Sequence, residues 1–276
     1  MITNLWYYPC GYCVNEMKYI VKKPAEKTRK FYAGVFLLKH ERFGYILFDT
    51  GYSKEIYDCG KKGALYNKLN PTFVKKKDTI KEQLLADGID AKKIRYIVLS
   101  HLHPDHIGGL KDFPNAKLVV SKECMKEYQK KKLRNLIFEK MLPEDFEKRV
   151  HKVRKFEQSV YTDVKRSYWE DVKRSLTGFD LFRDGSLFLL PLDGHARGQM
   201  GLLIKTAEGK KDILLAADAA WGSEFLDRVC EMSLPARLVQ NDYKMYAQNA
   251  ALLRTLTDGG MEIYFSHEPI EKKVLL

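Results

Sequence analysis

Residues 100–109 read Ser-His-Leu-His-Pro-Asp-His-Ile-Gly-Gly and follow an apolar, β-branched run at 95–99 that predicts a buried strand. Three imidazoles and one carboxylate therefore fall within six residues, at the point where a strand ends. Residues i and i+2 of an extended chain point to the same side, so we expect His101 and His103 to face one metal ion. Asp105 and His106 can reach a second ion beside it. This spacing favours a metal site over a chance cluster of histidines.

Pro104 and two glycines shape this stretch. The proline disfavours a helical conformation for His103, and the spacing differs from the i, i+4 histidine pair of a helical H-E-x-x-H site. We therefore expect an extended loop rather than a helix. Gly108 and Gly109 allow the backbone to pass close to the cluster before the next element begins.

Three further strand ends carry residues of the same chemical type. The apolar runs at 186–191, 212–217 and 262–266 lead into His195, Asp218 and His267. One His or Asp at a strand end is usually structural, but four strands that end in the same ligand chemistry indicate a common site. Together the candidates are five imidazoles and two carboxylates, a set that suits two ions.

The rest of the chain alternates strands and helices, which predicts an α/β fold with functional residues at strand ends. The apolar patterns and their start and stop signals predict further strands at 31–38, 44–49, 117–120 and 200–204, and helices at 79–87 and about 239–256.

Two polar residues near the first pair of strands are ambiguous. His40 lies in a polar turn between them, and we expect it at the surface. Asp49 ends the second strand, where it either hydrogen-bonds a metal-bound imidazole or closes an Asx-turn. The sequence leaves both roles open.

The composition changes between about 122 and 180. Residues 122–174 contain 16 Lys and Arg against 10 Asp and Glu, and the apolar spacing becomes helical. We interpret this segment as a basic insert of two or three helices within a single domain spanning 1–276. His151 is expected to be exposed there. Tyr161, Tyr168 and Trp169 are expected to pack within the insert, with a lid over the site as the alternative.

Length, charge and cysteines limit the remaining classes. A chain of 276 residues with a net charge of +12 can bury one sizeable core, and we interpret the charge mainly as solvated lysine cover. Nucleic acid, an anionic membrane surface and acidic substrates are the alternatives. No run is long enough for a membrane span and the start lacks a signal-peptide pattern, so the expected location is the cytosol. The five cysteines, including Cys10 and Cys13 of a C-x-x-C match, are expected to be reduced thiols.

The pattern H-x-H-x-D-H at 101–106, with His195, Asp218 and His267, resembles the metallo-β-lactamase-fold hydrolases, and within them the N-acyl-homoserine lactonase group. The resemblance implies an αββα sandwich of two mixed sheets with helices outside. It implies that His101, His103 and His195 hold one metal, that Asp105, His106 and His267 hold the other, and that Asp218 bridges them. True β-lactamases lack the histidine at position 106, so antibiotic hydrolysis is not expected.

The chain departs from the lactonases at Trp221. Lactonases have a tyrosine three residues after the bridging aspartate, and it assists the substrate carbonyl or the leaving group. Trp221 occupies that place here, and an indole donates one hydrogen bond but cannot act as an acid.

The expected chemistry is hydrolysis at a centre of two metal ions. Zinc is the expected metal, and manganese or iron are the alternatives. A bridging hydroxide attacks a carbonyl, and the leaving alkoxide is protonated through Asp105. A small-molecule lactone or another carboxylic ester fits best as the substrate. The rivals are a phosphodiesterase or nuclease of the same fold, a glyoxalase II-like thioesterase, and a non-catalytic metal-bearing binding protein.

Overall fold

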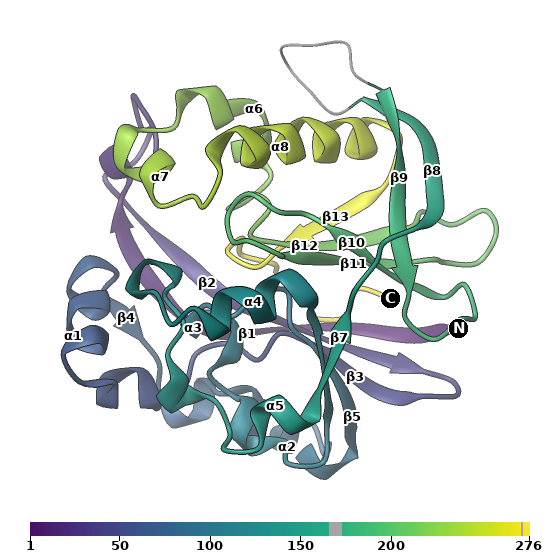
Figure 1. Ribbon diagram of the computed structural model, residues 1–276, viewed down its shortest axis with the longest axis horizontal. Coiled ribbons are helices and arrows are strands. Elements are labelled where there is room, and N and C mark those ends of the chain that lie inside the picture. Colours follow the sequence, from purple (N-terminus) through teal and green to yellow (C-terminus); the bar gives the residue numbers. More distant parts are fainter. Residues whose placement is uncertain (166–172, 272) are drawn as a thin grey trace.

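A computed structural model describes residues 1–165, 173–271 and 273–276. The chain forms two β-sheets that pack face to face, with helices on the two outer faces (Figure 1). This is the αββα sandwich of two mixed sheets that the sequence resemblance implied, and the expected fold class is confirmed.

Within the described residues the first sheet has seven strands in the order β4-β1-β2-β3-β5-β6-β7. Their bounds are β1 Ile2–Glu16, β2 Thr28–His40, β3 Gly44–Phe48, β4 Thr72–Phe73, β5 Ile94–Val98, β6 Lys117–Ser121 and β7 Val150–Val153. The described part of the second sheet has six strands in the order β13-β12-β11-β10-β9-β8. These are β8 Gln158–Lys165, β9 Lys173–Asp180, β10 Leu187–Pro191, β11 Met200–Ile204, β12 Ile213–Ala217 and β13 Glu262–Phe265.

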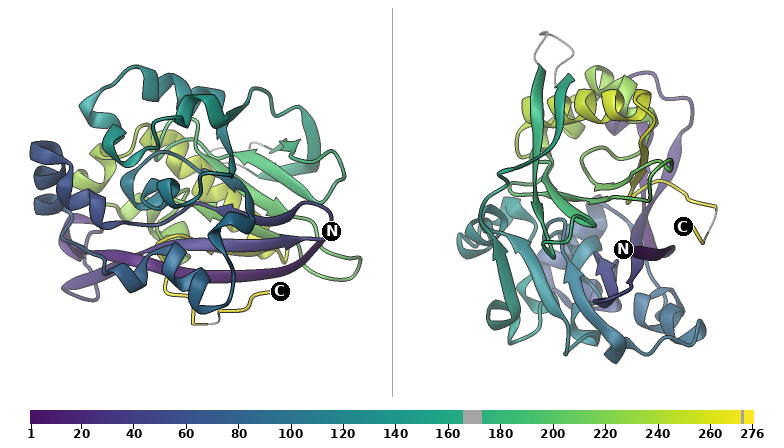
Figure 2. Two further views of the ribbon diagram at one scale, coloured as in Figure 1. Left: turned by 90° about the horizontal axis from the view of Figure 1, so that it is seen from below. Right: turned by 90° about the vertical axis from the view of Figure 1, so that its right-hand side faces the viewer.

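The helices separate into two groups by sheet (Figure 2). On the first sheet lie α1 Gly60–Leu69, α2 Ile80–Ala86, α3 Pro104–Ile107, α4 Lys122–Gln129 and α5 Phe146–Arg149, and on the second lie α6 Glu224–Arg228, α7 Leu234–Leu238 and α8 Tyr243–Asp258. No helix in these described ranges is long and apolar enough to cross a bilayer.

Three apolar clusters hold these layers together. The middle cluster joins both sheets, with Phe36 and Phe48 from the first and Leu189 and Leu215 from the second, all fully buried. The other two lie between each sheet and its own helices. Burying the strands on both faces explains why they read as nearly continuous apolar runs rather than as alternating ones.

The sequence located most of the elements that deliver the candidate ligands. Strands predicted at 31–38 and 44–49 are β2 and β3, paired antiparallel, and the helix predicted at 79–87 is α2. The long helix predicted at about 239–256 is α8. The first strand, β1, was not predicted, because its aromatic residues and its internal Pro9 and Gly11 break the strand pattern.

The interpretation of the basic segment at about 122–180 as a helical insert is wrong for most of its length. Among the residues of this segment that the structure describes, only α4, α5 and two single 3₁₀ turns are helical, and β7, β8 and β9 are strands. β8 and β9 pair antiparallel and extend the second sheet. Sheet pairing to β10 overrides the weak helical spacing of this charged segment.

The structure also tests the expectations for individual residues of this segment. His151 lies in β7, not in a helix, and is exposed as expected. Tyr161 packs against the core of the second sheet, and its hydroxyl donates a hydrogen bond to Asp212, which supports the packing role. Tyr168 and Trp169 lie outside the described residues.

The expectation that His40 lies at the surface is also wrong. Its side chain is 1% exposed. Its Nδ1 accepts backbone N–H hydrogen bonds from Arg42 and Phe43, and its Nε2 lies 3.1 Å from the Ser186 hydroxyl. The buried imidazole thus accepts hydrogen bonds from backbone N–H groups of the turn. A polar sequence alone does not distinguish this role from exposure of the side chain to solvent.

Gly34 in β2 makes a close backbone contact with the segment that carries His267. Its N–H donates to the Ser266 carbonyl at 2.9 Å. A Cβ at this position would lie 2.7 Å from that carbonyl oxygen and 2.7 Å from the Tyr7 ring. Only glycine therefore allows β2 to approach the end of β13 so closely.

We expect Gly34→Ala to lower the free energy of unfolding by about 1–3 kcal/mol, because the methyl group must displace a backbone carbonyl in a packed interior. Denaturant unfolding monitored by circular dichroism measures the change. The matched control is Gly259→Ala, where the nearest atom to the new Cβ is 3.4 Å away. Equal stability of the two variants would contradict the steric argument.

Candidate metal centre

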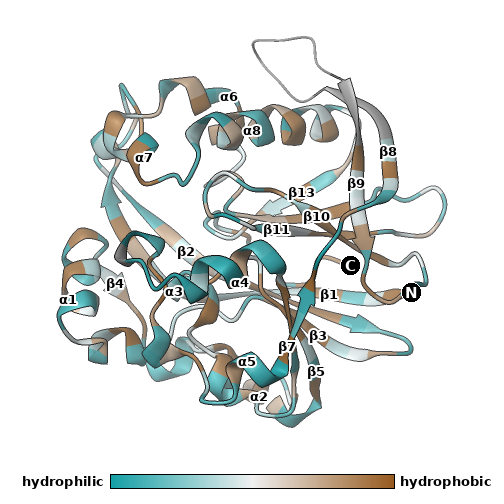
Figure 3. Ribbon diagram, viewed as in Figure 1, coloured by the Kyte–Doolittle hydropathy of each residue, from teal (hydrophilic) through white to brown (hydrophobic). Residues whose placement is uncertain are grey.

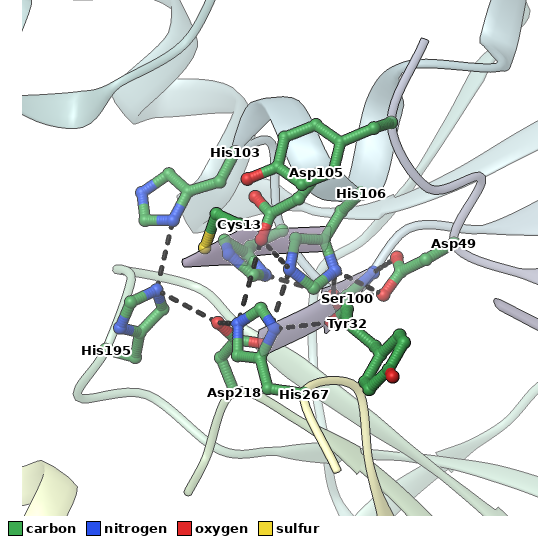
Figure 4. Close-up of polar contacts among 12 residues, drawn as sticks. Cys13, Tyr32, Asp49, Ser100, His103, Asp105, His106, His195, Asp218 and His267 are labelled. Atoms are coloured by element: carbon green, nitrogen blue, oxygen red, sulfur yellow. Dashed lines mark hydrogen bonds and ion pairs between the residues drawn. The ribbon is translucent and has the colours of Figure 1, made fainter. Parts of the chain in front are cut away.

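The seven candidate ligands converge at one place and form two groups (Figure 4). Within each group the nitrogen and oxygen atoms lie within 4.8 Å of one another, a spacing that can surround a single ion. The first group is His101, His103 and His195, and the second is Asp105, His106, Asp218 and His267. They come from the segments that follow β5, β10, β12 and β13, as the sequence pattern indicated.

Asp218 lies between the two groups. Its Oδ2 is 2.8 Å from His267 Nε2 in the second group and 3.4 Å from His195 Nε2 in the first. Its Oδ1 is 3.3 Å from His106 Nε2. One carboxylate thus faces ligand nitrogens of both groups.

Four imidazoles are held by hydrogen bonds to groups behind them. His106 Nδ1 donates to Asp49 at 2.7 Å, and Asp49 also accepts from the backbone N–H and hydroxyl of Ser100. The Ser100 hydroxyl lies 3.0 Å from His101 Nδ1. Of the two roles left open for Asp49, the structure therefore shows the hydrogen bond to a ligand imidazole. Such contacts orient the ring and select its tautomer.

His195 and His267 are oriented by residues that the sequence did not single out. His195 Nδ1 lies 2.9 Å from Gln240 Oε1, and His267 Nδ1 donates to the Tyr32 carbonyl at 2.7 Å. Gln240 lies between two helices, and Tyr32 contributes only its backbone. No local pattern marks either residue, because their roles depend on segments far apart in the chain.

The first group contains neutral imidazoles. Burial and the neighbouring imidazoles hold the pKa of His101 well below its ordinary value, and burial together with His195 lowers the pKa of His103 to about 3. Burial also lowers the pKa of His195. Neutral imidazole is the form that binds metal ions, so this group is prepared to act as a ligand set at pH 7.

The second group is charged. Burial raises the pKa of Asp105, but His106 and His267 outweigh it and leave the pKa at about 2. Burial likewise opposes ionisation of Asp218, yet His267 and His106 hold its pKa well below the ordinary value. The carboxylates in turn raise the pKa of His106 and His267 against the effect of burial. The carboxylates thus favour the protonated form of these two imidazoles, and a divalent cation could take the place of the protons.

Buried atoms without partners show that the residues fit metal ions. His101 Nε2 is shielded from solvent and forms no hydrogen bond, and the equally shielded His106 Nε2 and Asp218 Oδ1 face each other at 3.3 Å without forming one. Leaving such atoms unpaired costs about 1–3 kcal/mol each, so native proteins rarely tolerate it without a purpose. All three belong to the proposed ligand set and point into the cluster.

The backbone at the cluster combines extended and helical pieces. His103 is extended with ψ 157°, as Pro104 predicted, but a single helical turn, α3, begins at the proline. The expectation of a wholly extended loop is therefore wrong, because proline is also well suited to the first position of a helix. Asp105 and His106 lie on this turn. Ala217, directly before Asp218, has φ +49°, a strained conformation that orients the carboxylate.

Gly108 allows a close backbone approach, but to residues 51–53 rather than, as expected, to the ligand cluster. A Cβ there would lie 2.4 Å from the Ser53 N and 2.5 Å from the Gly51 carbonyl oxygen. The Gly108 N–H donates to that carbonyl at 2.8 Å, which fastens the metal loop to the end of β3.

Aromatic side chains border the cluster. The Trp221 ring lies edge-on to His195 with centroids 6.0 Å apart, and Phe31 lies edge-on to His267 at 6.0 Å. Trp221 and Phe31 also contact each other at 6.4 Å. Cys13, directly opposite Phe31 in the β1–β2 pairing, lies next to Asp105 in Figure 4.

The profile of the Metallo-beta-lactamase superfamily matches residues 35–266, which is most of the chain and includes six of the seven candidate ligands. The chain belongs to this superfamily. Its fold, its ligand cluster and its relatives make it a metal-dependent hydrolase.

Curated relatives include N-acyl homoserine lactonases. The chain is 26% identical to the N-acyl homoserine lactonase AttM of Azorhizobium caulinodans over 238 residues, which cover 85% of this chain and 81% of the relative. It is 38% identical over 79 residues to the probable metallo-hydrolase Rv2300c of Mycobacterium tuberculosis, a match that covers 28% of this chain and 25% of the relative.

Solved structures share the fold. An N-acyl homoserine lactone hydrolase with the product N-hexanoyl-L-homoserine at its catalytic metal centre superposes with a TM-score of 0.72 at 19% identity, covering 97% of this chain and 94% of that one. AidC, a dizinc quorum-quenching lactonase, gives a TM-score of 0.64 at 17% identity, covering 99% of this chain and 92% of that one.

The contact between Asp49 and His106 makes the following prediction. Asp49→Asn replaces a charged acceptor by an amide whose N–H₂ cannot accept from His106, so we expect the affinity for metal in the second group to fall about 10–100-fold. Competition with a chromogenic chelator measures this. Asp90→Asn, which changes an exposed helix cap (Asp90 accepts from the Lys92 N–H), serves as the control. Wild-type metal affinity in Asp49→Asn would refute the role.

Proposed function

We propose that this protein hydrolyses a small-molecule lactone, or another carboxylic ester, at a centre of two divalent ions, with zinc as the first candidate and manganese or iron as alternatives. The observation that carries the proposal is the pair of adjacent donor groups with Asp218 between them. In this assignment His101, His103 and His195 hold one ion, Asp105, His106 and His267 hold the other, and Asp218 bridges them.

Two such ions would supply a hydroxide nucleophile at neutral pH and polarise the carbonyl that it attacks. The chain provides the surroundings for this chemistry. The ligands are buried except for His103, which is partly exposed. This burial keeps the local dielectric low and strengthens the charge interactions in the site. His103 marks the side on which a substrate can enter.

Two residues are proposed to act on the substrate directly. Asp105 is a buried carboxylate whose Oδ2 lies 3.5 Å from His106 Nε2 and 3.6 Å from His267 Nε2. In that position it can collect the proton released by the nucleophile and transfer it to the leaving oxygen. Trp221 borders His195 and can donate one hydrogen bond through its indole N–H, so it would orient the substrate rather than protonate it.

The relatives support this choice of substrate class. The curated relative that covers most of the chain is an N-acyl homoserine lactonase, and a structure of the same fold holds N-hexanoyl-L-homoserine at its metal centre. AidC, also of this fold, is a dizinc lactonase. The five unpaired cysteines support a reducing, cytosolic location, and the family match over 35–266 supports a single domain with no separate insert domain.

A substrate panel tests the proposal. We expect the zinc-loaded protein to hydrolyse a lactone faster than a thioester or an activated phosphodiester, to lose that activity with a chelator, and to regain it when zinc is restored. Preference for the phosphodiester would make the protein a phosphodiesterase, and preference for the thioester a glyoxalase II-like enzyme. Metal binding without turnover on any substrate would indicate a non-catalytic binding protein.

Asp218→Ala tests the bridging assignment. Removing the carboxylate leaves the two groups without a shared ligand, so we expect the bound metal to fall from two ions to one per chain and turnover to drop by more than a hundredfold. Inductively coupled plasma mass spectrometry gives the metal content. Two ions bound by the variant would show that Asp218 is not the bridge.

Trp221 is tested by two substitutions. Trp221→Phe retains an aromatic wall but removes the hydrogen-bond donor, and we expect kcat/KM on the lactone to fall about tenfold, the value of one hydrogen bond to a polar group. Trp221→Tyr restores a donor and should recover activity or exceed that of the wild type. Equal kcat/KM for the wild type and Trp221→Phe would exclude a role for the indole N–H.

A further inference from the structure

Large apolar side chains are exposed on one end of the molecule. The described residues include twelve exposed large apolar side chains, and nine of them belong to two groups of elements. The α7 rim comprises Tyr19, Leu234, Leu238, Val239 and Met245, and the α1 rim comprises Tyr57, Leu65, Leu69 and Phe73. Helices α7 and α1 lie at the same end in Figures 1 and 2, and both carry hydrophobic residues in Figure 3.

The α7 rim is connected directly to the first ligand group. Val239 is followed by Gln240, whose side chain contacts His195, and the Asn241 N–H donates to the His195 carbonyl at 3.0 Å. The Ser233 N–H donates to the Ile20 carbonyl at 2.9 Å, which fastens the turn carrying Tyr19 to α7.

The α1 rim is connected to the second ligand group. Phe73 stacks on Tyr12 with centroids 5.3 Å apart, and Tyr12 contacts Tyr32 at 5.9 Å. The Tyr32 carbonyl accepts the hydrogen bond from His267. Each rim is thus connected, through a short series of contacts, to one of the two ligand groups.

The same segments are strongly basic. Residues 17–30 contain six Lys and Arg and one acidic residue, and so do residues 57–77, while residues 234–245 contain two basic residues and one acidic residue. Together they carry a net charge of +11, whereas residues 122–174 carry +6 and the remaining residues are net negative. Most of these lysines are exposed, including Lys75, Lys76 and Lys77.

We propose that this end of the protein docks on an anionic lipid surface, with the metal centre facing the lipid. Exposed leucines on two rims can enter the headgroup region, while the surrounding lysines contact anionic headgroups. A second copy of the chain is disfavoured as the occupant because two faces of the same high charge repel each other. Nucleic acid would use the lysines but would gain little from Leu234 and Leu238, which are 67% and 74% exposed.

The test is co-sedimentation of the zinc-loaded full chain with vesicles. We expect binding to phosphatidylcholine vesicles that contain about one quarter phosphatidylglycerol, little binding to phosphatidylcholine alone, and release at high salt. Binding is the readout, so the result does not depend on the proposed enzymatic function. Failure to bind either vesicle would overturn the proposal.

Matched variants separate the apolar and charged contributions. Leu234→Ser with Leu238→Ser is expected to weaken binding to the anionic vesicles at least tenfold, because two side chains lose their contact with lipid. The control is Leu85→Ser on α2, where the leucine is 64% exposed but lies on neither rim, and it should bind as the wild type does. Thermal unfolding confirms that each variant is folded.

A triple variant that removes positive charge combines Lys75→Gln, Lys76→Gln and Lys77→Gln. It should also weaken binding to the anionic vesicles about tenfold or more. Its control is Lys210→Gln with Lys211→Gln, on the exposed turn between β11 and β12. Binding to anionic vesicles that persists in the leucine variant, but is competed by single-stranded RNA, would assign the face to nucleic acid instead. A dimer in sedimentation equilibrium that the leucine variant dissolves, with no vesicle binding, would assign it to a second copy.

Discussion

The structure depends on one electrostatic constraint, the confinement of five imidazoles and two carboxylates in a volume shielded from water. Ionised groups at that depth are expensive unless opposite charges lie beside them. In the second group, Asp105 and Asp218 raise the pKa values of His106 and His267, and these imidazoles in turn lower the pKa of Asp218. The first group contains no carboxylate, and burial lowers the pKa values of its imidazoles. Each group also contains a buried imidazole nitrogen without a hydrogen bond, and these are properties of a site that binds cations.

This constraint explains why so much of the surrounding structure is rigid. Asp49 and Ser100 hold His106, Gln240 holds His195, and the Tyr32 carbonyl holds His267. Several of these contacts depend on close backbone approaches that only glycine permits, such as that of Gly34 to Ser266. The fold thus places its least adaptable packing where misplacement of a ligand by a fraction of an ångström would matter most.

The approach to the centre has a different character from its interior. Inside, polar atoms are fixed and shielded, whereas outside, Leu234, Leu238 and Leu69 are more than half exposed and lysines surround them. An apolar face of this kind is suited to an apolar substrate, which is desolvated before it reacts. Trp221 and Phe31, which contact each other, place aromatic surface against His195 and His267.

The sequence by itself indicated the chemistry of the candidate ligands and the strands that deliver them, because each candidate follows an apolar run and strand periodicity is a local property. The αββα class was implied by the resemblance of the ligand pattern to a known family. The sequence did not determine the first strand, the β8–β9 hairpin in place of helices, or the burial of His40, since these depend on pairing and packing with distant segments. The helical turn at Pro104 was missed because proline restricts the preceding residue while favouring a helix after it. Only the tertiary structure decided which donors share a group, that Asp218 faces both, and that Gln240 and Tyr32 orient the histidines, because those relations join residues from separate strands and no spacing along the chain encodes them.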